Sequence, residues 1–281
     1  MHKNKNPNQK YIILFFLYFR INTQVDKDLK GKYVVLDVPM VYARESYLLK
    51  VRKLSTMEPY FILMKSNQKD HLLEKDIRKE FEFHKGLMKY VGFKEGEEHV
   101  YFFLQYEKMV CPLRDVLDLL KEGGPRGKWK KYFLQIFQIV MAFVRRGVIL
   151  DSITLDDFHY DILTEKILLV NINHPHKAAI LFEPDCRQNG QFTFLNHELE
   201  NLIKIQLGKI YYALATGDEL PFRANFDYSV DLVRISNLLL QNLLLKLLSP
   251  ARLPYVAYTT KKDMHEPILL ESLYLHEFFL T

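Results

Sequence analysis

A change of hydrophobic pattern near the middle of the chain is the feature that most constrains its fold. Before residue 107, short runs of aromatic and aliphatic residues at 32–38, 47–52 and 60–65 alternate with polar stretches, which predicts β-strands. After residue 112, apolar residues recur every three or four positions in long segments such as 129–146, which is typical of helices. The sequence therefore predicts an α+β chain in which strands come first and helices follow.

This pattern divides the chain into an N-terminal extension at 1–31, a strand-rich lobe at 32–107 and a mostly helical lobe at 108–281. With 281 residues, 48% of them hydrophobic, the chain can bury a substantial core in two such lobes. Periodicity and breaker residues such as Gly147 predict helices at 72–90, 113–121, 129–146, 195–216 and 229–248, and further strands at 90–93, 99–106, 166–170 and 177–181.

The N-terminal extension holds an apolar run of nine residues, Tyr11 to Phe19, behind a basic polar head. The run is too short to span a membrane, which takes about 20 residues, and no small-residue cleavage site follows it. We interpret it as a leading element that packs on the domain. A secretory signal over residues 1–22 remains the alternative.

The charge and cysteine content indicate the setting of the protein. The net charge is +5, but the Lys and Arg residues are scattered, which favours acidic protein partners over a nucleic acid. The two cysteines, Cys111 and Cys186, lack metal-ligand spacing, so we expect a reducing, cytoplasmic location. No segment has the length of a membrane span.

Several motifs occur in one order along the chain. The strand that ends Phe61-Ile-Leu-Met-Lys65 comes first, and the segment from Tyr132 to Asp151 follows, with its long helix, glycine turn and loop. Next come a Thr-Gly…Pro-Phe turn within 206–222 and a late helix with its arginine at 245–252. This order resembles the protein kinase superfamily over about residues 32–281. The resemblance implies a two-lobed kinase-like fold, with a small β-rich N-lobe carrying one main helix and a larger, mostly helical C-lobe.

In the N-lobe, the resemblance implies a nucleotide site. Lys65 falls on the lysine that grips the α- and β-phosphates of ATP. Glu80 fits best as the glutamate that pairs with it, and Glu82 is the alternative. The backbone of Gln105, Tyr106 and Glu107 would offer hydrogen-bonding groups to the adenine.

In the C-lobe, the resemblance implies catalytic and metal positions. Asp151 falls on the catalytic aspartate, and Asp156 falls on the asparagine that binds Mg²⁺. If the register of the Asp-Phe-Gly motif is shifted, Glu183 would be the second metal ligand, with Asp185 as an alternative. The cofactors implied are ATP and Mg²⁺.

Three departures from the family pattern predict that this chemistry is impaired. The segment 38–47, in place of the glycine-rich loop, has no glycine to let backbone amides approach phosphate. Ile149 and Leu150 replace the His-Arg before the catalytic aspartate, and Leu181 stands where the motif needs its carboxylate. Because phosphoryl transfer depends on bound Mg²⁺ and a cradled triphosphate, we expect a pseudokinase that binds protein partners and binds nucleotide weakly or not at all. A divergent active Ser/Thr protein kinase remains the alternative, so enzyme activity is left open.

Overall fold

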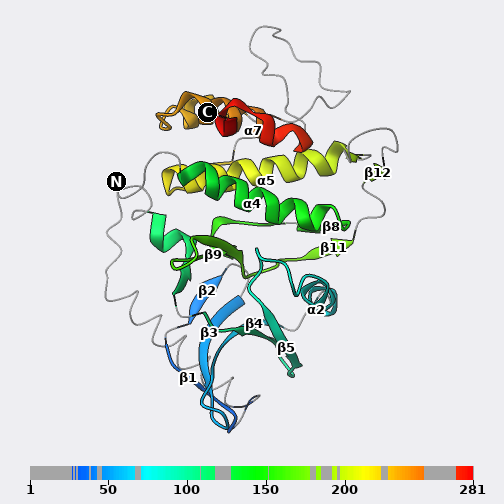
Figure 1. Cartoon of the computed structure of the whole chain (residues 1–281), viewed down its shortest axis with the longest axis vertical. Coiled ribbons are helices and arrows are strands. Elements are labelled where there is room, and N and C mark those ends of the chain that lie inside the picture. The colour runs from blue at the N-terminus through cyan, green and yellow to red at the C-terminus, as the bar shows by residue number, and fades with distance from the viewer. Residues whose placement is uncertain are drawn as a thin grey trace. The chain divides into compact units, whose positions relative to one another are not determined.

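The computed structural model describes most of the chain from residue 27 onward (Figure 1). The described residues are 27, 29, 31–37, 39–42, 46–66, 71–107, 109–117, 128–150, 152–177, 182–184, 192–194, 197–222, 227–249 and 270–280. Contacts divide the chain into two compact units, 1–108 and 109–281, which are described separately. The predicted extension at 1–31 lies mainly outside the described residues.

An antiparallel sheet of six strands forms the N-terminal unit. Its order is β1 (Tyr33–Val35), β3 (Ser46–Lys53), β4 (Pro59–Ser66), β6 (His99–Gln105) and β5 (Tyr90–Glu95), and β2 (Met40–Tyr42) also pairs with β3. Apolar side chains of the central strands, including Leu49, Val51 and Ile62, are fully buried in its core. The strands predicted for this half of the chain are confirmed.

Among the described residues of this unit, the main helix is α2 (His71–Glu80), which ends earlier than the predicted 72–90. The amide of Phe81 still bonds to the carbonyl of Ile77 at 2.9 Å, and a tight turn then follows, with the amide of His84 bonded to the carbonyl of Phe81. Phe81 and Met88 are buried, but Met88 lies beyond the turn and outside any helix. The apolar spacing beyond residue 81 therefore fits a helical period, although the helix ends at Glu80.

The C-terminal unit is built on α4 (Lys128–Val144), α5 (His197–Thr216) and α7 (Leu238–Leu248). Figure 1 shows these helices in layers, with strands on the α4 side. β7 (Val110–Pro112), β9 (Phe158–Asp161) and β10 (Lys166–Leu169) form one small sheet, β8 (Val148–Leu150) pairs with β11 (Pro175–Lys177), and β12 (Phe182–Pro184) pairs with β13 (Phe192–Phe194). Short helices are η1 (Leu113–Val116), η2 (Leu155–Asp157), α6 (Ser229–Leu232), η3 (Leu270–Leu275) and α8 (Glu277–Leu280). The structure is thus α+β, with the sheet first and most helices second.

The ends of these elements follow local chemistry. Gly147 has φ of +69° just after α4, a conformation that glycine adopts without strain. The single helix predicted over 229–248 is two helices, because Asn237 caps α7 by accepting a hydrogen bond from the amide of Leu240 at 3.0 Å. The strand predicted at 166–170 is β10. Of the strand predicted at 177–181, the structure describes only Lys177, which is the last residue of β11, and residues 178–181 lie outside the described part.

A close approach joins α5 to α7. A Cβ atom added at Gly208 would lie 2.7 Å from Cδ2 of Leu248 and 3.3 Å from Cβ of Leu247, so only glycine fits there without movement. This packing fixes α5, which carries part of the pocket described below. None of the described helices is long and apolar enough to cross a membrane.

Candidate functional sites

A buried network of three charges lies between β4 and α2 in the N-terminal unit. Nζ of Lys65, near the end of β4, lies 2.8 Å from Oε2 of Glu74. The other carboxylate oxygen of Glu74 accepts hydrogen bonds from Nε and Nη2 of Arg78 at 2.9 and 2.7 Å. Arg78 is 1% exposed and Glu74 is 3% exposed, so one buried carboxylate is shared by two cations.

The carboxylate that meets Lys65 is therefore Glu74, and the choice of Glu80 from the sequence is corrected. Glu80 is the exposed last residue of α2. It lies six positions after Glu74, about 240° further round the helix, so the two side chains leave different faces. The spacing of four residues between Glu74 and Arg78 is the sequence signal that could have identified the pair.

Of the three residues predicted to contact adenine, Gln105 is the last residue of β6, and Tyr106 and Glu107 follow it. The amide of Gln105 already donates to the carbonyl of Lys89 at 2.9 Å. The ring of Tyr106 packs on Phe61, with 5.2 Å between ring centroids. Glu107 is half-buried. The first backbone donor of this segment is therefore used within the protein.

In the C-terminal unit, the carboxylate of Asp157 is the centre of a buried polar cluster. Oδ2 accepts hydrogen bonds from the amide and the hydroxyl of Thr154 at 2.8 and 3.0 Å, which makes a capping box at η2. Oδ1 accepts from Nδ2 of Asn171 at 2.7 Å and from Nδ2 of Asn173 at 3.0 Å. Asp157 is 1% exposed. Its two oxygens thus receive four protein donors.

The neighbouring carboxylate, Asp156, is bound by a guanidinium. Nε of Arg114 bonds to Oδ1 of Asp156, and Nη2 lies 3.2 Å from Oδ2. This bond to Asp156 raises the pKa of Arg114. Nη1 of Arg114 also lies 3.4 Å from the carbonyl of Gly217, and Nη2 lies 3.7 Å from Oε1 of Glu219. Arg114 therefore connects η1 to η2, which contains Asp156, and to the turn after α5.

The described residues do not fit a magnesium site. A hard cation needs carboxylate oxygens that are free to coordinate it. Both oxygens of Asp157 instead accept hydrogen bonds from N–H or O–H groups, and the positive guanidinium of Arg114 binds Asp156. Within the described part of the chain, no three His, Cys, Asp or Glu side chains gather to hold a metal. Asp151 and Asp185 lie outside the described residues, as does the side chain of Glu183.

Sequence reasoning chose Asp156 in this region but missed Asp157, Asn171, Asn173 and Arg114. The two asparagines lie two positions apart directly after the apolar strand β10. That spacing places both amides on one side of an extended segment, and it is the signal that could have pointed to the cluster.

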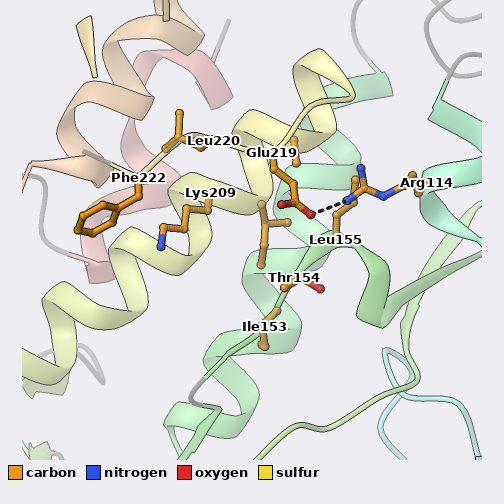
Figure 2. Close-up of a pocket in the computed structure, with 10 residues that line it drawn as sticks. Arg114, Ile153, Thr154, Leu155, Lys209, Glu219, Leu220 and Phe222 are labelled. Atoms are coloured by element: carbon orange, nitrogen blue, oxygen red, sulfur yellow. Dashed lines mark ion pairs between the residues drawn. The ribbon is translucent and has the colours of Figure 1, made fainter. Parts of the chain in front are cut away.

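A pocket of about 210 Å³ lies between η1, η2 and the end of α5, wholly within the C-terminal unit (Figure 2). Four of its lining residues are apolar and buried and form its floor, and the other six, which form its rim, are polar or at least partly exposed. The floor contains Ile153, Leu155, Ile210 and Ala213, and the rim contains Arg114, Thr154, Lys209, Glu219, Leu220 and Phe222.

Comparison with known proteins gives no relative from which a role could be taken. No family model matches the chain, and no curated protein matches its sequence. A function must therefore be argued from the side chains at the sites above.

Proposed function

We propose that this chain is a kinase-like pseudokinase, which uses a protein-kinase scaffold to bind other proteins and does not transfer phosphate. The order of a β-sheet with one main helix and then a mostly helical unit supports the scaffold. So does Lys65, which stands near the end of β4 and meets a carboxylate on that helix at 2.8 Å, as the resemblance implies.

The position of the hairpin β9–β10 favours a new register for the Asp-Phe-Gly motif. In the kinase scheme, that motif comes shortly after the catalytic loop, at the end of a strand. Here β10 ends at Leu169, and Asn171-Ile172-Asn173 follows. This register replaces the one that placed Leu181 at the carboxylate position, because Leu181 lies beyond β11.

The observation that carries the proposal is the hydrogen-bonded carboxylate of Asp157. In the new register, the neutral amide of Asn171 takes the place of a metal-binding carboxylate and donates to Asp157 at 2.7 Å. Phosphoryl transfer in kinases needs Mg²⁺ held by such oxygens to neutralise the phosphates. Because protein donors already occupy the oxygens of Asp157, the segment supports a binding role better than a catalytic role.

The test is the thermal unfolding midpoint of the full chain with ATP, in the presence and absence of Mg²⁺. A ligand at about 100 times its dissociation constant adds about 2.7 kcal/mol of stability, a shift of several degrees. We expect the midpoint measured with ATP and Mg²⁺ to equal the midpoint measured with ATP alone. A shift that requires Mg²⁺ and disappears in Lys65→Ala, read against that variant's own midpoint, would favour the active kinase instead.

Two matched variants sharpen this test at the proposed metal position. Asn171→Asp adds a buried carboxylate beside Asp157, so we expect lower stability that Mg²⁺ partly restores. Asn171→Ala removes the same hydrogen bond without adding a charge, and Mg²⁺ should not restore its stability. Equal responses of both variants to Mg²⁺ would remove the support for the new register.

A further inference from the structure

We infer that the pocket in Figure 2 is a docking site for a peptide segment of a partner protein, one that presents an apolar side chain with an acidic residue beside it. The inference rests on the proposed binding function and names a site and a ligand class for it. It draws only on residues of the C-terminal unit.

The floor of the pocket suits one apolar side chain. Ile153, Leu155, Ile210 and Ala213 are each at most 6% exposed. Ile210 and Ala213 belong to α5, which the close contact at Gly208 fixes against α7. A volume of about 210 Å³ is below the range of about 300–1,000 Å³ that is usual for small-molecule sites. A single anchor side chain therefore matches the pocket better than a whole cofactor.

The two positive charges on the rim differ in their ion pairs. Arg114 is neutralised by Asp156 and lies 3.7 Å from Glu219. Lys209 is exposed and forms no ion pair with any residue that the structure describes. Figure 2 shows Lys209 on the side of Phe222, away from Glu219. An acidic residue next to the anchor would pair with Lys209, while Glu219 would repel a second acid on the opposite side. The net charge of +5 agrees with an acidic ligand.

An exposed aromatic side chain stands at the rim of the pocket, and further exposed apolar side chains follow it in the sequence. Phe222 is 81% exposed at its rim. Val230 in the next helix, α6, is 72% exposed, and Val233, directly after this helix, is 75% exposed. The segment that follows α6 contacts the turn beside the pocket, because Nη1 of Arg234 lies 3.6 Å from a carboxylate oxygen of Asp218. Aromatic and aliphatic surface that a partner covers is the usual core of a protein interface.

The experiment measures fluorescence anisotropy of labelled pentapeptides added to the full chain. The first peptides have a central leucine with one glutamate before or after it, and alanine elsewhere. Control peptides replace leucine with serine or glutamate with lysine. We expect one glutamate–leucine peptide to bind, and both of its controls to bind about tenfold more weakly, which is the factor expected for the loss of one well-placed contact.

Variants on the rim test where the peptide binds. Lys209→Glu should weaken the binding of the glutamate peptide about tenfold and strengthen the binding of the lysine peptide, because it reverses the charge that pairs with the acidic residue. Phe222→Ala should weaken all leucine peptides about tenfold. The controls are Lys166→Glu, which makes the same charge reversal at an exposed position of β10, and Leu163→Ala, which truncates an exposed apolar side chain in the turn before β10. They should leave binding unchanged.

Three results would overturn the inference: no binding of any leucine peptide, equal binding of the serine peptide, or no effect of Lys209→Glu. Sedimentation could also show that the free chain is a dimer and that Phe222→Ala dissociates it. This result would assign the pocket to a second copy of the chain and would also overturn the inference. None of these results depends on Mg²⁺ or ATP, so docking can fail while the pseudokinase proposal stands. Conversely, ATP stabilisation that requires Mg²⁺ would remove that proposal without deciding the peptide result.

Discussion

At the scale of single residues, Glu74 decides the charge balance of the N-terminal unit. Lys65 and Arg78 each contact one oxygen of its carboxylate. Burial of these groups leaves little solvent to screen the two cations from each other. A buried ion network of this kind is costly to break by removal of one member, because the remaining charges stay buried.

We therefore predict that Glu74→Gln lowers the free energy of unfolding of the N-terminal unit by about 3–5 kcal/mol. The matched control is Glu80→Gln on the same helix, which should change it by about 0.5 kcal/mol or less because that side chain is exposed. Amide hydrogen exchange in β4 and α2 measures both. Equal protection in the two variants would show that Glu74 does not hold the helix to the sheet.

At the scale of elements, the sequence predicted those strands that carry their own pattern. β3, β4 and β6 have seven or eight residues each and could be found from local composition. β9 has four residues, including His159, which is completely buried. A strand this short is defined by its pairing with β7 and β10, which no local pattern reveals.

The hairpin β9–β10 also bears on the interpretation of the candidate site. Without β9, the sequence places the strand before the Asp-Phe-Gly position at 177–181 and a metal ligand at Glu183, and that ligand stays a prediction. The partner of Lys65 was misplaced for a related reason, since Glu74, Glu80 and Glu82 lie in similar charged sequence. Only the placement of α2 against the sheet distinguishes them. The sequence therefore does not identify those site residues whose partners are set by tertiary contacts.

Packing of α5 on α7 leads to a prediction at this scale. Gly208→Ala would place a methyl group 2.7 Å from Cδ2 of Leu248, so we expect a loss of about 1–3 kcal/mol from overpacking. Urea unfolding followed by the fluorescence of Trp129, the one tryptophan in the sequence, measures it in this unit. If the clash is the cause, Gly208→Ala should cost less in a Leu248→Ala background than alone. Additive losses would contradict it.

At the scale of the whole molecule, buried bases make stability depend on pH. Burial lowers the pKa of His159 to about 3, and burial, aided by Lys246, lowers the pKa of His276. Since the ordinary histidine pKa is about 6.5, the unfolded chain binds protons first as the pH falls. Stability should therefore decrease below about pH 6.5, and the contribution of His159 is fully lost only near its folded pKa of about 3.

We predict that His159 accounts for a slope of up to about 1.4 kcal/mol per pH unit in this window. Urea unfolding of the wild type and of His159→Gln, repeated from pH 7.5 to pH 4.5, should give curves that converge at low pH. The substitution lowers stability at neutral pH, so the slope is the diagnostic quantity. Parallel curves would mean that His159 does not remain neutral in the folded chain.

The order of strands in the N-terminal sheet has a consequence for handling the protein in solution. The short strands β1 and β2 lie at one edge and β5 lies at the other, where unpaired backbone groups can recruit another chain into a growing fibril. β1 has three residues, and β5 has an irregular register between Tyr90 and Gly92 and ends in the exposed charges of Lys94 and Glu95. Short, bent and charged edges are poor templates for such growth. This sheet therefore carries its own protection against edge-to-edge aggregation.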